Sequence, residues 1–207
     1  MIEQSLQNYI EKEIIPRYDN FDKAHRRDHV EYVIKESLRL SSFYGLDENM
    51  VYTVAAYHDT GLVVDRKTHH LVSGQIIRSD DKLRKWFSNE QIETMAQAAE
   101  DHRASSDHEP RSIYGKIVAE ADRQIDADTI IRRTVQYGLS HYPELDREGH
   151  WNRTLEHLNK KYSRTGYLKL WIPESPNAER LAKLWDLIDD VDQLRVKFEH
   201  TYNTETA

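Results

Sequence analysis

Apolar residues recur every three or four positions along most of this chain, which is the period of an α-helix. The most continuous apolar run covers residues 51–60 and places Val51 on the same face as His58. Gly61 follows at once and is a natural stop for a helix. The pattern therefore predicts a buried helix whose last turn carries an adjacent histidine and aspartate, His58 and Asp59.

Helical spacing continues on both sides of this run, and several of the expected helices have visible boundaries. Pro16 ends the first helix, Gly45 ends the second, and Asp47 is placed to cap the central one. No segment keeps the alternation of apolar and polar residues typical of a strand, so the fold is expected to be all-α. The other expected helices cover residues 3–15, 28–44, 70–87, 89–102, 113–126, 128–145 and 177–202, with loops at 18–22, 62–70, 103–112 and 165–176.

The length of the chain sets its expected domain organisation. At 207 residues it can bury a sizeable core within one domain. We expect a single domain, residues 1–207, with a helical bundle as its core over about residues 20–145 and a C-terminal helical extension over 146–207. The apolar stripe of the last helix serves either the core or a homodimer.

Composition narrows the class of protein and the chemistry open to it. Only 7 glycines and 5 prolines occur, which argues against a β-sandwich or a disordered chain. A net charge of -7 gives no electrostatic reason to expect nucleic acid as a partner. No apolar stretch approaches the length of a membrane span and the N-terminus does not resemble a signal peptide, so a cytoplasmic protein is expected. Because the chain has no cysteine, any metal must be held by His, Asp or Glu.

Histidines and aspartates stand at or near the apolar faces of five expected helices. Burying a charged group costs several kcal/mol or more unless the group is paired or bound to a metal. Imidazole and carboxylate together suit Mn, Fe, Co, Ni or Zn, with Mg as a possible companion, so we expect one or two divalent ions here. The candidate ligands are His29, His58, Asp59, His70, His102 and Asp122.

The order of these motifs resembles that of the HD-domain phosphohydrolases. The resemblance covers about residues 20–135 and rests on His29 with its helix, on the HDTG sequence at 58–61, and on Asp122 in a closing stretch over 116–128. Two further motifs, which begin at His70 and surround His102, resemble the extra histidine motifs of the branch that binds two metals.

The resemblance implies an all-α HD-domain helical bundle and assigns the candidate ligands to two metal ions. His29, His58, Asp59 and Asp122 would surround a first metal, while His70 and His102 would hold a second ion that Asp59 bridges to the first. The assignment between His70 and its neighbour His69 stays open. The cyclic-dinucleotide branch adds a GYP signature and a Glu where this chain has His25, and no GYP tripeptide occurs, so that branch is not expected.

The resemblance also implies attack of metal-activated water on phosphorus, which needs a general acid or base within hydrogen-bond reach. Asp65 and His69 are the candidates, with Asp101 as an alternative. Guanidinium and ammonium groups suit phosphate oxygens, and basic residues stand beside nearly every ligand motif. The expected phosphate-binding residues are Arg26, Arg66, Lys67, Arg103 and Lys116, with Arg27 and Arg111 nearby.

The leading hypothesis is thus a metal-dependent phosphohydrolase whose partner is a small phosphorylated molecule, a nucleotide or another phosphate ester. Three alternatives remain open at this point: a di-iron oxygenase of the HD type, a non-catalytic nucleotide-binding module, and a helical protein without metal. The segment over residues 166–176 is hypothesised to close over the pocket and shape substrate choice.

Overall fold

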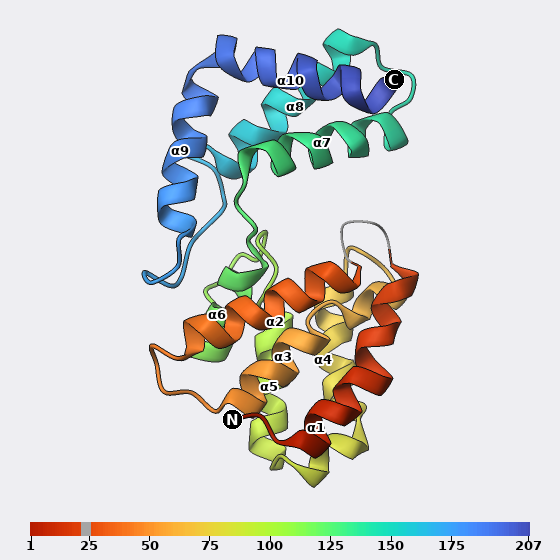
Figure 1. Ribbon diagram of the computed structural model, residues 1–207, viewed down its shortest axis with the longest axis vertical. Helices are drawn as coiled ribbons and strands as arrows, with labels where there is room; N and C mark the ends of the chain where they lie inside the picture. The colour runs from red at the N-terminus through yellow and green to blue at the C-terminus, as the bar shows by residue number, and fades with distance from the viewer. Residues whose placement is uncertain (22–25) are drawn as a thin grey trace. The chain divides into compact units, whose positions relative to one another are not determined.

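The computed structural model of the protein describes residues 1–21 and 26–207, so His25 lies outside the described residues. Throughout that part of the chain the regular elements are helices and no strand occurs, which confirms the all-α fold class (Figure 1). The α-helices are α1 (Gln4–Tyr9), α2 (Arg27–Ser41), α3 (Glu48–Tyr57), α4 (His69–Ser79), α5 (Asn89–Glu100), α6 (Ile113–Asp122), α7 (Ala127–His141), α8 (Arg147–Tyr162), α9 (Asn177–Asp189) and α10 (Val191–Thr206).

The chain forms two compact units. The first unit contains residues 1–123 together with 171–175, and the second contains residues 124–170 together with 176–207. We expected one domain with its core over about residues 20–145 and an extension over 146–207. In the structure the division instead falls after Arg123, directly behind the last expected metal ligand.

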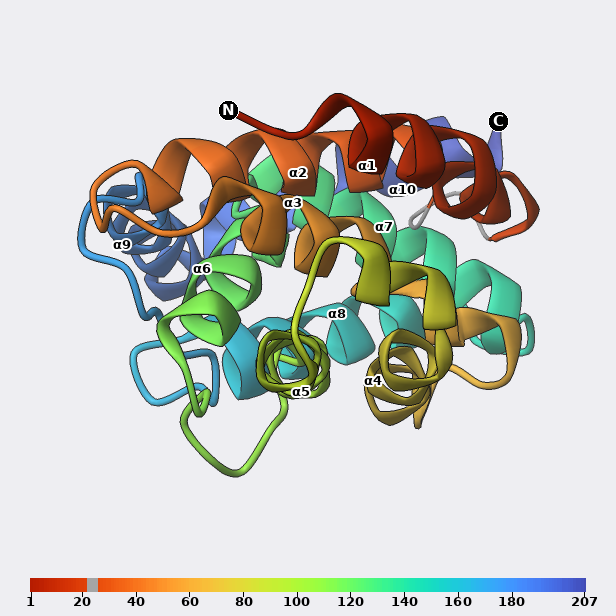
Figure 2. The ribbon, with the colours of Figure 1, turned by 90° about the horizontal axis from the view of Figure 1, so that it is seen from below.

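Helix α3 is the centre of the first unit. All of its residues from Met50 to Tyr57 are buried, because α2, α5 and α6 pack around it. Asp47 caps its N-terminus as predicted, with a side chain that accepts a hydrogen bond from the Asn49 N–H. Helices α4 and α5 lie side by side, and Figure 2 views them nearly end-on. The central helix is thus held on several sides, which fixes the direction in which its C-terminal end points.

The N-terminal segment is helical beyond the predicted stop at Pro16. After α1 the chain continues as a π-helix (Ile10–Ile14) and then as a 3₁₀-helix (Ile15–Asn20). Pro16 stands in the first turn of the 3₁₀-helix, where its missing N–H has no helical partner to lose. Tyr18, expected in a loop, is therefore part of a regular turn and is fully buried.

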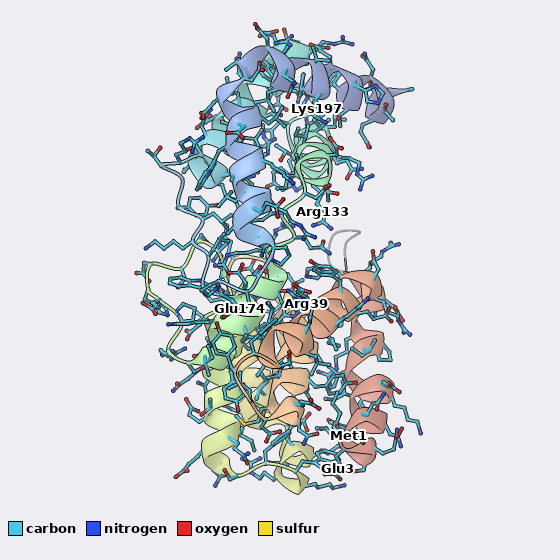
Figure 3. The ribbon with its side chains drawn as sticks, turned by 60° about the vertical axis from the view of Figure 1, so that its left-hand side comes forward. Met1, Glu3, Arg39, Arg133, Glu174 and Lys197 are labelled. Atoms are coloured by element: carbon cyan, nitrogen blue, oxygen red, sulfur yellow. The ribbon has the colours of Figure 1, made fainter. Side chains whose placement is uncertain are left out.

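A short segment from the C-terminal half of the sequence, residues 171–175, completes the first unit. The Trp171 N–H donates a hydrogen bond of 2.7 Å to the buried Glu120 of α6. Glu174, labelled in Figure 3, accepts a hydrogen bond of 2.6 Å from the Tyr44 hydroxyl. The segment has no helical structure, as expected, and Ile172 packs in a buried cluster with Leu40, Val51 and Ile117.

The second unit consists of α7, α8, α9 and α10. Helix α8 was not predicted, and the helix expected over residues 177–202 is in fact two helices. Asp190 causes that break, because its side chain accepts a hydrogen bond from the Gln193 N–H and caps α10. Lys197 of α10, labelled in Figure 3, forms an ion pair of 2.7 Å with Asp128 of α7.

Within residues 1–21 and 26–207, no helix is both long and apolar enough to cross a bilayer.

Candidate metal centre

One buried carboxylate lies between four imidazole rings in the first unit. Oδ2 of Asp59 lies 3.3 Å from Nε2 of His58 and 3.6 Å from Nε2 of His29. The other oxygen, Oδ1, lies 3.2 Å from Nε2 of His69 and 3.4 Å from Nε2 of His102. Each oxygen of Asp59 therefore faces its own pair of histidines.

A second carboxylate, that of Asp122, lies beside the pair formed by His29 and His58. Oδ1 of Asp122 lies 3.2 Å from Nε2 of His29 and 3.8 Å from Nε2 of His58. We call the group of His29, His58, Asp59 and Asp122 the first half-site. The second half-site consists of Asp59, His69 and His102, whose potential ligand atoms lie within 4.8 Å of one another.

Local turns orient three of the four histidines in the same way. The Nδ1–H of His58 donates to the carbonyl of Ala55 at 2.7 Å, and that of His102 donates to the carbonyl of Ala99 at 2.5 Å. His69 makes the same bond to the carbonyl of Arg66 at 2.7 Å. In each case the acceptor lies three residues earlier, so a single helical turn or tight loop supplies it.

These hydrogen bonds determine which ring nitrogen can bind a metal. A backbone carbonyl only accepts, so Nδ1 of each of these rings carries the proton and Nε2 presents a lone pair. This is the second-sphere arrangement usual for metal-binding histidines. The Nε2 atoms of His69 and His102 approach to 3.1 Å, and those of His29 and His58 approach to 3.3 Å.

Two Nε2 lone pairs at such a distance, as in His69 and His102, repel unless a proton or a metal ion lies between them. Imidazole nitrogens and carboxylate oxygens are ligands for divalent first-row metals, and both half-sites consist of these groups alone. The residues therefore fit a divalent ion in each half-site, with Asp59 shared between the two.

The pKa shifts reflect the same demand for positive charge. Burial would raise the pKa of Asp59, but its interactions with the imidazoles of His58, His102 and His29 lower that pKa well below its ordinary value. Burial would lower the pKa of His29, yet its hydrogen bonds to Asp122 and Asp59 raise that pKa to about 10. The pKa of Asp122 is lowered as well, despite burial, by its hydrogen bond with His29. Both carboxylates are therefore stabilised as anions.

The structure places His69, and not its neighbour His70, beside Asp59. We expected His70 to be the ligand and His69 to be an acid-base group, but His69 lies beside Asp59 and His102. Adjacent helix residues point about 100° apart, so only one of the two can face Asp59. Burial and the nearby rings lower the pKa of His70 to about 4, so it stays neutral at pH 7.

Asp65 and Asp101 are engaged elsewhere. Asp65 is exposed and accepts hydrogen bonds of 3.2 Å from both the N–H and the hydroxyl of Thr68, which stabilise the turn before α4. Asp101 is buried and forms an ion pair of 2.8 Å with Arg111. The geometry therefore supports neither carboxylate as the acid or base expected from the sequence.

The expected phosphate-binding residues divide into those in the loops next to His69 and His102 and those on other segments. Nη1 of Arg103 donates a 2.6 Å hydrogen bond to the carbonyl of Lys67, and this bond joins the loops next to His102 and His69. Arg66 is exposed in the same loop. On the other segments, Lys116 forms an ion pair with Glu109, and Arg27 forms one with Asp19. Arg111 forms ion pairs with Asp101 and Glu100. Arg26 is exposed at the start of α2.

Gly61 brings the turn after Asp59 into direct contact with α4. Its N–H donates to Oγ of Ser73 at 2.9 Å. A Cβ atom at Gly61 would lie 2.0 Å from the carbonyl oxygen of His69 and 2.7 Å from the backbone nitrogen of Ser73. The sequence predicted this glycine as a helix stop, but the close approach of two backbones is the stronger reason for it.

Comparisons with known proteins agree with this geometry. Residues 26–124, which contain all six residues of the two half-sites, match the family model of the HD domain. A solved structure with a similar fold is that of a predicted HD superfamily hydrolase from an uncultured Thermotogales bacterium, at 20% identity and a TM-score of 0.50, over 75% of this chain and 87% of that one. The comparison with curated proteins gives no match. Over residues 26–124 the chain is therefore similar to the HD-domain family.

Proposed function

We propose that this protein is a metal-dependent hydrolase that cleaves small phosphate esters, with nucleotides as the leading class of substrate. The observation that carries the proposal is the position of Asp59, whose two oxygens face two separate pairs of Nε2 atoms. Similarity to a predicted HD superfamily hydrolase supports the hydrolase class.

In this proposal the protein joins the two half-sites and orients the histidine rings. Asp59 joins the half-sites, and the carbonyls of Ala55, Ala99 and Arg66 hold three rings so that their Nε2 lone pairs face inwards. A bound divalent ion would supply the charge that activates water and neutralises a phosphate oxygen.

Cations beside the second half-site favour a phosphate ester as the substrate. Lys67 stands two residues before His69, and Arg103 directly follows His102. The Arg103–Lys67 hydrogen bond keeps these two residues together. Guanidinium and ammonium groups suit the oxygens of a phosphate group, and both residues stand close to ligands of this half-site in the sequence.

A panel of substrates tests the proposal. Nucleoside mono-, di- and triphosphates and an aryl phosphate are incubated with purified protein and Mn²⁺, Co²⁺ or Mg²⁺, and phosphate release is measured. We expect turnover by the wild type and at least a 100-fold loss in Asp59→Ala, because one ligand leaves both half-sites. Asp81→Ala is the matched control, since Asp81 has a 91% exposed side chain that forms an ion pair with Arg84 in its own turn.

Each outcome of that panel has a clear meaning. Turnover that persists in Asp59→Ala would refute the assignment of the centre. Metal binding without turnover on any phosphate ester would instead favour a non-catalytic nucleotide-binding module.

The second half-site favours one alternative function. Two imidazoles and one carboxylate form the ligand set of many non-haem iron oxygenases. Oxygen consumption by iron-loaded protein, together with no phosphate release in the presence of manganese, would support a di-iron oxygenase over the hydrolase.

A further inference from the structure

At the C-terminal end of α3, backbone groups form hydrogen bonds with side chains in place of other backbone groups. In a continuing helix, the Asp59 N–H would donate to the carbonyl of Ala55, four residues earlier. That carbonyl already accepts the Nδ1–H of His58 at 2.7 Å. The Asp59 N–H donates elsewhere, and both it and the carbonyl of Ala56 need partners, because buried backbone groups without a hydrogen bond are costly.

One hydroxyl serves both groups. Oη of Tyr18 donates to the carbonyl of Ala56 at 2.9 Å and accepts from the Asp59 N–H at 3.3 Å. Tyr18 is fully buried, and its ring centroid lies 6.3 Å from that of His58. A hydroxyl is needed for this role, since only a group that both donates and accepts can bind a carbonyl and an N–H together.

The exchange leaves Asp59 in a conformation outside the helix. Its backbone angles are φ -107° and ψ 5°, in the bridge region rather than in the helical range. The carboxylate then points into the centre, with one oxygen towards each half-site.

We propose that Tyr18 is a positioning residue for the metal centre: its hydroxyl ends α3 at the His58-Asp59 pair and holds Asp59 in the orientation that serves both half-sites. The inference rests on the proposed metal-dependent function. It concerns a residue outside the HD-domain match, which begins at residue 26.

The test compares two tyrosine-to-phenylalanine variants of the full chain. Tyr18→Phe removes the hydroxyl that contacts Asp59. Tyr57→Phe is the matched control, because its hydroxyl, also on a largely buried ring, donates instead to Asp80 at 2.6 Å, away from the centre. Mn²⁺ affinity is measured by calorimetry, and the visible spectrum of bound Co²⁺ reports the geometry of the ligands.

We expect Tyr18→Phe to bind Mn²⁺ about 10- to 100-fold more weakly, as is typical when a second-sphere partner is lost, and to shift the Co²⁺ bands. Tyr57→Phe should lose stability but keep the affinity and the spectrum of the wild type. Unchanged binding and an unchanged spectrum in Tyr18→Phe, or an equal loss in both variants, would overturn the inference.

Two further results separate this inference from the proposed function. A wild type that binds neither metal would refute the proposed function itself, whereas a wild type that binds while Tyr18→Phe binds equally well refutes only the role of Tyr18. If Tyr18→Phe does not fold, amide hydrogen exchange of the wild type gives the answer. The Asp59 amide should exchange slowly, and exchange as fast as in an exposed loop would contradict its bond to Tyr18.

Discussion

At the scale of single residues, orientation decides which histidine can be a ligand. His69 and His70 are chemically identical neighbours, yet only His69 has its Nδ1 bound to a carbonyl three residues earlier and its Nε2 beside Asp59. His58 and His102 share this pattern, and both follow an alanine three residues earlier. The sequence identified the residue types needed for the centre, but it could not show which of two adjacent rings points inwards.

A pair of alanine variants checks this distinction by metal analysis. His69→Ala removes a ligand from the second half-site only, so we expect the bound metal to fall from two ions per chain to one. His70→Ala should keep both ions, because its ring is not among the groups that face Asp59. The reverse pattern, with loss of an ion only in His70→Ala, would restore the assignment made from the sequence.

A buried ion pair next to His102 leads to a prediction on stability. Asp101 is buried and depends on Arg111, whose hydrogen bonds keep the pKa of Asp101 low in spite of burial. Arg111→Ala leaves this carboxylate without its main partner and should lower the free energy of unfolding by about 2–3 kcal/mol.

Chemical denaturation measures this loss. The matched control is Arg84→Ala, which removes an exposed pair with Asp81 and should cost less than about 1 kcal/mol. Equal effects in the two variants would show that the burial of Asp101 does not matter.

At the scale of elements, the ends of helices carry the chemistry. His29 lies in the first turn of α2, His69 begins α4, and Asp122 ends α6. His58 directly follows the end of α3, and His102 is the second residue after the end of α5. Apolar periodicity predicted most of these helices well, because it depends on local spacing alone. It missed α8 and the break at Asp190, since α8 has few apolar residues and a capping aspartate within a helical pattern resembles any polar position.

Gly61 gives the element-scale prediction. In Gly61→Ala the new Cβ meets backbone atoms of His69 and Ser73, which cannot move aside as a flexible side chain could. The turn and α4 must separate, so we expect a loss of about 3 kcal/mol or more in the free energy of unfolding and weaker binding of metal at the second half-site.

The control for this experiment is Gly45→Ala. Gly45 has a φ of 61° and no atom within 4 Å of its would-be Cβ, so the cost should be about 1 kcal/mol from backbone strain alone. Metal binding should not change in this variant. A Gly61→Ala protein with wild-type stability and metal content would contradict the close approach of the turn to α4.

At the scale of the whole molecule, contacts distant in sequence account for what the sequence did not show. Nothing in the local pattern indicates that residues 171–175 join the first unit, or that the second unit begins after Arg123. The convergence of five ligand-bearing segments was inferred from histidines and aspartates near apolar helix faces and from resemblance to a family, since spacing along the chain does not determine distances in space. The bond between Tyr18 and Asp59 spans 41 residues and left no recognisable motif.

Acid sensitivity of the second unit is a prediction at this scale. Burial, with the nearby Lys161 and Arg153, lowers the pKa of His157 from 6.5 to about 4. The unfolded chain then binds a proton that the folded chain does not, so stability should fall as the pH drops from about 6.5 to about 4. Thermal unfolding across this range, compared between the wild type and His157→Gln, isolates the effect. A wild type and variant with parallel pH profiles would contradict the prediction.

The central claim is that Asp59 joins two metal-binding half-sites, and the most direct measurement is the number of divalent ions bound per chain. Elemental analysis of Mn²⁺-loaded, desalted protein should give two ions for the wild type and two for the Asp81→Ala control. Asp59→Ala should retain fewer than one, because each half-site loses a carboxylate oxygen. A wild type without bound metal, or an Asp59→Ala variant that keeps both ions, would contradict the account.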